Sequence, residues 1–364
     1  MSRLEPLTDE SNRRVLIVDD TLFLRDRSKH VELLARVHNH NTGRYHKGFR
    51  MLTMGWSDGC SFVPILLSLL SSANEKSRLV PMRDDLDKRT NGYKRRQESV
   101  RKSTDVLVDL VSLAMAAGIK ARHLLFDSWF AFPGTIRKIR ALGMHTVCML
   151  KDMPKINYTF GERQVTLKAL FKLIHKRPGR TNVLATCLVN IGNDDKGQPV
   201  PAKIVFVRDR NSRSWLALLS TDTTLTDEDI ITLYKRRWDI ETFFKIAKSF
   251  LKFAKECQSR SYDAMVAHAT LVCCRYLILE ISKRTTADPR TLGTLFHATC
   301  DEMQQASFTE ALALLLKLLE QALKDVVGFT KEQVEHLVQQ FIDQLPPVFR
   351  GRLLLLAATN DKYY

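Results

Sequence analysis

The chain has 364 residues, of which 45% are hydrophobic, and carries a formal charge of +16. This length and apolar content are enough to bury one large core or two smaller ones, which excludes a wholly disordered protein. The excess of Lys and Arg favours a polyanionic partner, with nucleic acid ahead of an anionic membrane surface. We find no signal-peptide core and no apolar run near the roughly 18 residues that span a bilayer, so we expect a cytoplasmic protein without membrane contact.

The cysteines are scattered, without a Cys-x-x-Cys pair, and lie mostly among apolar neighbours. We therefore expect reduced core thiols rather than a structural zinc site. They are Cys60, Cys148, Cys187, Cys257, Cys273, Cys274 and Cys300.

The first part of the chain indicates three strands and then a helix. Residues 13–21 form a short β-branched run that ends in two acids, Asp19 and Asp20. Residues 44–56 and 60–66 flank a Ser-Asp-Gly turn and predict a hairpin, whereas residues 22–41 are too polar to assign. The charge-dense stretch 83–103 fits either a nucleic-acid contact or a solvated loop.

A helical pattern follows and stops at Gly118, and the apolar run that starts at His123 ends in a third acid, Asp127. Residues 133–142 then read as a helix and 146–150 as a strand. Further on, short β-prone pieces alternate with turn signals, and one more strand precedes a capping-box sequence at Thr226. The last part is helical.

Together these patterns predict an α/β protein whose mixed sheet is flanked by helices and interrupted by a β-rich insertion. We expect a short N-terminal segment, a catalytic core in two parts, the insertion and a helical C-terminal region. The N-terminal segment covers 1–12, the two parts of the core cover 13–154 and 214–284, the insertion covers 155–213 and the C-terminal region covers 285–364.

Residues 234–256 predict a helix with one carboxylate inside a basic stripe. At about 100° per residue, Tyr234, Arg237, Glu241 and Lys248 share one face, and Lys245 and Lys252 join it. The opposite face is apolar and predicts packing on a core. An ordinary amphipathic helix with solvated charges gives the same pattern. A lone Glu among cations is, however, a good metal ligand beside phosphates.

If Asp20 and Asp127 end neighbouring strands and the Glu241 helix packs across the sheet, three carboxylates converge. Carboxylate oxygens are the ligands that Mg²⁺ prefers, and paired ions can activate a nucleophile and stabilise a leaving oxygen. The sequence therefore favours metal-dependent phosphoryl transfer.

The spacing of four residues carries a family resemblance. Tyr234, Arg237, Glu241 and Lys248 match the Tyr-Arg-Glu-Lys signature of a large group of bacterial insertion-sequence transposases. At about one in twenty per fixed position, such a match would arise by chance in this chain roughly twice in a thousand. Val-Asp-Asp-Thr at 18–21 and Leu-Phe-Asp-Ser at 125–128 also resemble that family's acidic motifs.

This resemblance implies a ribonuclease H-like catalytic domain and a DDE metal triad of Asp20, Asp127 and Glu241. It also implies two Mg²⁺ ions, with Mn²⁺ as a substitute. The expected partners are double-stranded DNA, both terminal inverted repeats and target, and further copies of the chain assembled on it at the nucleoid. Phosphate contacts are expected from Tyr234, Arg237 and Lys248, and the basic face adds Lys245 and Lys252.

Adjacent strand residues face opposite sides, so only Asp19 or Asp20 should serve directly; the family pattern, with the ligand just before Thr, favours Asp20. For Trp129 and Trp215 core packing is favoured over stacking on a flipped base. His38, His40 and His46 are expected to be ordinary exposed histidines.

The expected activity is cleavage and strand transfer at transposon ends, that is, DNA transposition and recombination by an insertion-sequence enzyme. Only nineteen residues precede Asp20, whereas relatives carry a larger end-binding region. The alternative is therefore a truncated, catalytically silent transposase that acts as a DNA-binding or inhibitory remnant. An RNA-cleaving nuclease on the same fold is less favoured.

Overall fold

The computed structural model describes residues 13–40, 42–179, 181–209, 214–324, 330–344 and 350. The expected N-terminal segment 1–12 therefore lies outside the described residues. The chain divides into two compact units, residues 1–289 and 290–364, which are considered separately.

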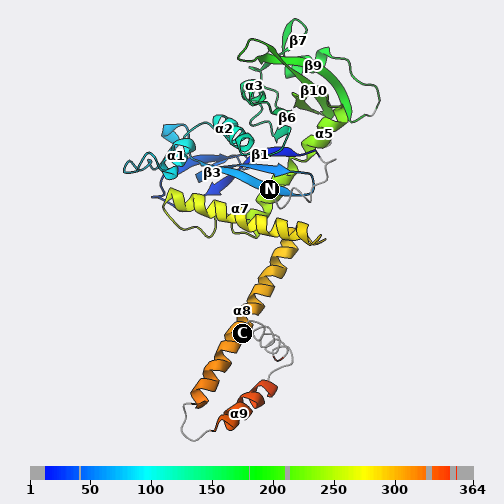
Figure 1. Ribbon diagram of the computed structural model, residues 1–364. Coiled ribbons are helices and arrows are strands. Elements are labelled where there is room, and N and C mark those ends of the chain that lie inside the picture. The colour runs from blue at the N-terminus through cyan, green and yellow to red at the C-terminus, as the bar shows by residue number, and fades with distance from the viewer. Residues whose placement is uncertain are drawn as a thin grey trace. The chain divides into compact units, whose positions relative to one another are not determined.

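A single sheet organises the larger unit (Figure 1). Among the described residues it has 11 strands, in the order β2-β3-β1-β5-β6-β11-β10-β9-β7-β8, with β4 also on β3. The strands are β1 (Val15–Leu24), β2 (Ala35–Asn39), β3 (Arg44–Ser57), β4 (Phe62–Leu70), β5 (His123–Phe126), β6 (His145–Leu150), β7 (Asn157–Phe160), β8 (Arg163–Thr166), β9 (Val183–Asn193), β10 (Pro199–Arg208) and β11 (Trp215–Ser220).

The sheet is mixed, as the sequence predicts, and most of its pairings are antiparallel. β3 and β4 form the expected hairpin, and β3 pairs antiparallel with β1 from Val15↔Ser57 to Leu24↔Gly48. β1, β5 and β6 are parallel neighbours, and their connections contain helices, as parallel strands require. Beyond Ile17, β1 has no further pairing with β5, so its edge there is open.

The β-prone segment after residue 150 extends this same sheet. β9 and β10 pair antiparallel, and β7 and β8 continue the sheet beyond them. β11 then returns to pair with β6, with Leu150 opposite Ala217. The segment predicted as an insertion thus lies between two paired strands, β6 and β11, and its own strands lie on the far side of β11.

Helices of the larger unit lie against both the parallel strands and the N-terminal hairpin. They are α1 (Asn91–Ser99), α2 (Ser103–Ala116), α3 (Pro133–Ala141), α4 (Leu167–Leu173), α5 (Asp227–Lys235), α6 (Trp238–Ser249) and α7 (Tyr262–Thr285). The capping box expected at Thr226 is present, with Asp229 as its reciprocal partner.

The prediction of a single helix over 234–256 is wrong: the chain breaks between α5 and α6, and α6 ends earlier than predicted. The backbone N–H groups of Arg236 and Arg237 bond the carbonyls of Leu233 and Tyr234, three residues back, and this tightened turn separates α5 from α6. α6 ends at Ser249 because the chain turns to bury Leu251 and Phe253, with positive φ at Lys252 and Ala254. The apolar spacing that suggested more helix belongs to this turn.

α7 packs one face on β4 and on α6. Its buried positions include Met265, Ala269, Val272 and Tyr276, the spacing of a core helix. Contrary to the sequence-based expectation, α7 is also long and apolar enough to cross a membrane by length and composition alone. A core helix meets the same criterion, and its buried face fits that interpretation.

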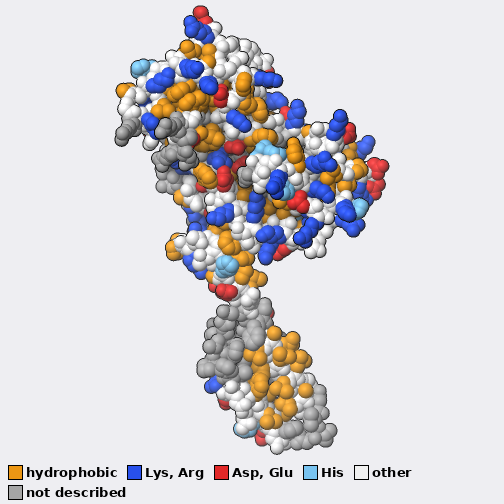
Figure 2. All heavy atoms as spheres, turned by 180° about the vertical axis from the view of Figure 1, so that it is seen from behind, with side chains coloured by type: hydrophobic (Ala, Val, Ile, Leu, Met, Phe, Trp, Pro, Cys, Tyr) orange, Lys and Arg blue, Asp and Glu red, His pale blue; other side chains and the backbone are white. Residues whose placement is uncertain are grey.

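The C-terminal unit contains α8 (Leu292–Lys324) and α9 (Lys331–Gln344). α8 is one continuous helix, because no Gly or Pro interrupts it after its first turn. Figure 2 shows Lys and Arg side chains spread over one face of the larger unit and hydrophobic side chains gathered on this smaller unit. The latter include exposed Leu314, Leu315 and Leu318 of α8.

Candidate active site

The carboxylates of the first two acidic motifs meet because β1 and β5 are parallel neighbours. Asp127 follows the last residue of β5, and its Oδ1 accepts a hydrogen bond from the backbone N–H of Trp129 at 2.8 Å. Asp19 and Asp20 lie in the middle of β1, since the strand continues to Leu24 rather than ending at the acids. Their side chains are 18% and 11% exposed.

The third carboxylate approaches from α6 through an arginine. Arg237 contacts Glu241 Oε1 with Nη2 at 2.6 Å and Asp19 Oδ2 with Nη1 at 3.2 Å. Its guanidinium also lies 5.9 Å from the ring of Tyr234. Tyr234, Arg237 and Glu241 of the predicted basic face therefore lie side by side, and Arg237 links α6 to β1.

Arg50 is a site residue that the sequence analysis missed. Its Nη1 lies 2.7 Å from Asp20 Oδ1, and its Nη2 donates to the carbonyl oxygen of His38. Asp20 Oδ2 is buried without a hydrogen-bond partner. The available signal was an Arg set among Phe49, Met51 and Leu52 in the strand that pairs with β1.

Two cavities open on these groups along the free edge of β1. The larger, of about 540 Å³, contains Asp20, Asp127 and Lys248, and the smaller, of about 310 Å³, is lined by both Asp19 and Asp20. Both acids of the pair thus reach the site, although the sequence favoured only Asp20. The exposed Lys245 and Lys252 line neither cavity.

Core packing was expected for both Trp129 and Trp215, and the structure shows it for only one of them. Trp215 packs on Phe171 and Phe206, as predicted. Trp129 is 47% exposed, lines the smaller cavity and lies 4.8 Å from the His40 ring, so its core assignment is wrong. It follows a strand end, where the chain turns outward. His38 and His40 line the larger cavity, whereas His46 pairs with Asp26.

Burial first, and repulsion between the acids second, raise the pKa of the carboxyls in the site. Burial raises the pKa of Asp19 to about 7, with Asp127 adding to the rise and Arg237 opposing it. Burial also raises the pKa of Asp20, against the effect of Arg50. The pKa of Asp127 is raised by burial and, further, by Glu241. Negative charge is therefore only partly compensated by the arginines.

A divalent cation would supply the missing positive charge. Within the described part of the chain, no three His, Cys, Asp or Glu side chains are close enough to hold a metal ion as they stand. The carboxylates are instead held by Arg50 and Arg237. The orphaned Asp20 Oδ2 and the raised pKa values of Asp19 and Asp127 nevertheless fit a cation at this place.

Asp19→Asn is expected to raise the melting temperature at pH 8, in the absence of divalent ions, and to give a clearly smaller gain at pH 5. The ordinary pKa of this carboxyl is 3.8 and the folded value is about 7. The folded state therefore holds a proton that the unfolded chain releases, and stability falls as pH rises between these values. Asn removes that loss. An equal gain at both pH values would contradict the assignment.

Carboxylates on β1, just after the parallel β5 and on α6, set among cations, resemble the set expected of a DDE-type endonuclease, although as they stand they do not surround one metal position. Two family models each match less than half of the chain. Residues 2–153 match the model described as DDE superfamily endonuclease, and residues 188–338 match the model described as archaeal putative transposase ISC1217. Asp19, Asp20 and Asp127 lie in the first match, and the face from Tyr234 to Lys248 lies in the second.

A solved structure of piggyBac transposase in a synaptic complex with hairpin DNA also resembles the chain, with a TM-score of 0.45 and 12% identity. The match covers 89% of this chain and 56% of that one, so the chain spans little more than half of that protein. At this level the likeness transfers no property. No curated protein matches the chain.

Proposed function

We propose that the chain is the transposase of a bacterial insertion sequence, which cleaves transposon ends and transfers the strands to target DNA. The observation that carries the proposal is that Asp20 and Asp127 line the same cavities while Arg237 joins Glu241 to the neighbouring Asp19, in segments that match DDE-type and transposase families. The mixed sheet, with its two acidic strands adjacent, supports the ribonuclease H-like core implied by the sequence. We also propose a cytoplasmic, nucleoid-associated protein that assembles as a homo-oligomer on DNA.

In this proposal Asp20, Asp127 and Glu241 hold two Mg²⁺ ions, or Mn²⁺ in their place. Bound metal would activate the attacking oxygen and stabilise the leaving oxygen. Arg237 and Lys248 bind backbone phosphates, the first through its planar fork and the second as a point charge. Tyr234 adds a hydroxyl donor and a ring beside Arg237. Lys245 and Lys252 are exposed and available to DNA outside the two cavities.

The test uses the purified chain and labelled duplexes carrying the DNA that flanks its gene. We expect nicking at the element boundary with Mg²⁺ or Mn²⁺, followed by joining to a target plasmid, and neither reaction in the presence of EDTA. A duplex of scrambled sequence is the control. Binding of the flanking DNA without cleavage under any divalent ion would defeat this proposal and favour the silent remnant instead.

A further inference from the structure

A second cationic cavity lies away from the carboxylates, between the loop after β1 and the loop before α7. Its volume is about 290 Å³. The first loop contributes Arg27, Ser28, Lys29, His30 and Val31, and the second contributes Gln258 and Arg260. No Asp or Glu lines it. Arg27, Lys29 and Arg260 are all exposed.

Hydrogen bonds join the two loops, so they hold the walls of the cavity in place. Arg25 donates to the carbonyl oxygens of Cys257 and Ser259, the latter at 2.6 Å, and Glu32 N donates to Arg260 O at 3.2 Å.

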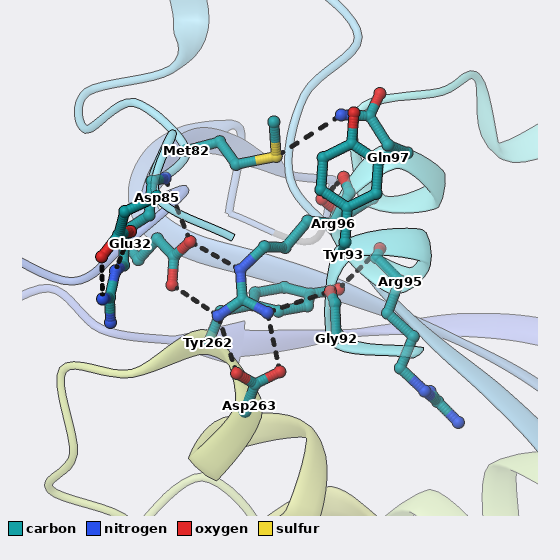
Figure 3. A network of polar contacts seen from close by, with 12 residues as sticks. Glu32, Met82, Asp85, Gly92, Tyr93, Arg95, Arg96, Gln97, Tyr262 and Asp263 are labelled. Carbon is teal, nitrogen blue, oxygen red and sulfur yellow. Dashed lines mark hydrogen bonds and ion pairs between the residues drawn. The ribbon is translucent and has the colours of Figure 1, made fainter. Parts of the chain in front are cut away.

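Just beyond the cavity, both loops end on one buried arginine. Figure 3 shows Arg96 between Glu32 and Asp263. Glu32 follows the first loop and Asp263 follows the second.

The cations of this cavity have no counter-ion. Within the described ranges, the side chains of Arg27, Lys29 and Arg260 make no hydrogen bond or ion pair. Each acid that flanks the loops is already engaged. Asp26 pairs with His46, Glu256 pairs with Arg275, and Arg96 holds both Glu32 and Asp263. An unneutralised cluster of this kind attracts an anion.

The position of the cavity identifies the anion. The same two chain segments also line the larger active-site cavity, through Leu22 and Leu24 on one side and Phe253 and Lys255 on the other. Arg27 is seven positions after Asp20 in the chain, so their Cα atoms are at most about 25 Å apart. A DNA strand advances about 3.4 Å per nucleotide along the helix axis, so the reach corresponds to about seven nucleotides.

We propose that Arg27, Lys29 and Arg260 form a second phosphate-binding site, which holds the DNA backbone within about seven nucleotides of the phosphate at the carboxylates. His30, Ser28 and Gln258 complete it as polar groups. The proposal rests on the proposed function, because that function supplies DNA at the carboxylates.

The test compares Arg27→Ala/Lys29→Ala/Arg260→Ala with the wild-type full chain. Binding of a fluorescein-labelled 30-base-pair duplex is measured by anisotropy, without divalent ions, from 50 to 200 mM NaCl. We expect the triple variant to bind roughly tenfold to hundredfold more weakly at low salt, with a salt slope lower by about 2 to 3.

The matched control is Arg83→Ala/Arg89→Ala/Arg101→Ala. It removes the same charge from exposed arginines that already pair with Asp85, Asp87 and Asp109. Affinity and salt slope equal in the two triple variants would overturn the proposal. Because no cleavage is measured, loss of binding in the first variant alone supports this site even if the chain never cleaves DNA. If the wild-type chain cleaves DNA but the two triple variants bind DNA equally well, the proposed function is supported and the second phosphate-binding site is rejected.

Discussion

Glu241→Gln is expected to reduce metal-dependent nicking and joining at least about a thousandfold, since a metal site supplies several kcal/mol of transition-state stabilisation. Gln keeps the size of the side chain and an oxygen that can accept the hydrogen bond from Arg237. The fold should therefore be unchanged. DNA affinity should stay within about threefold, because no phosphate contact is lost. The measurements are single-turnover cleavage and anisotropy binding.

Glu228→Gln is the matched control, since Glu228 is exposed in the first turn of α5 and outside both cavities. It should cleave like the wild type. Normal strand transfer by Glu241→Gln would remove Glu241 from the metal site and leave the Tyr-Arg-Glu-Lys interpretation without its central residue.

Arg96→Ala is expected to lower the free energy of unfolding by about 3 to 5 kcal/mol, because it leaves a buried carboxylate without its partner. Arg96 is 1% exposed and its partner Glu32 is 7% exposed. Its Nε and Nη2 donate to Glu32, and its Nη1 and Nη2 donate to Asp263. Chemical denaturation with urea measures the loss.

Arg96→Lys should give an intermediate loss, since an ammonium group keeps the charge but cannot form two bidentate pairs. Arg89→Ala removes an exposed pair with Asp87 and should leave stability nearly unchanged. Equal stabilities for Arg96→Ala and Arg89→Ala would show that the buried network contributes nothing.

The adjacency of the strands that carry Asp20 and precede Asp127 could be predicted because each is an apolar run, and such runs form neighbouring central strands. The hairpin of β3 and β4 and the cap of α5 were also predictable, because a turn sequence and a capping box are local signals. The end of α6 was not. Phe253 has the spacing of a helical core residue, yet it is buried through a turn with positive φ on either side.

The residues that sequence reasoning missed act through contacts between distant segments. Arg50 meets Asp20 only because β3 pairs with β1, and Arg96 joins residues that are 64 and 167 positions away. The charge-dense stretch around Arg96 fits either a DNA contact or a solvated loop from sequence, and in the structure Arg83, Arg89 and Arg101 pair with nearby acids. Composition shows that charge is present, and only the fold shows whether it is already neutralised.

Because β11 returns to pair with β6, the length of the segment between these two strands does not determine where the acids lie. Leu150 and Ala217 are partners across two adjacent strands, so the ends of the intervening segment are fixed side by side. Closing a flexible segment between fixed ends costs only about 0.6 kcal/mol for each doubling of its length. Segments of very different size can therefore be exchanged at this point in evolution while Asp127 and Glu241 keep their places.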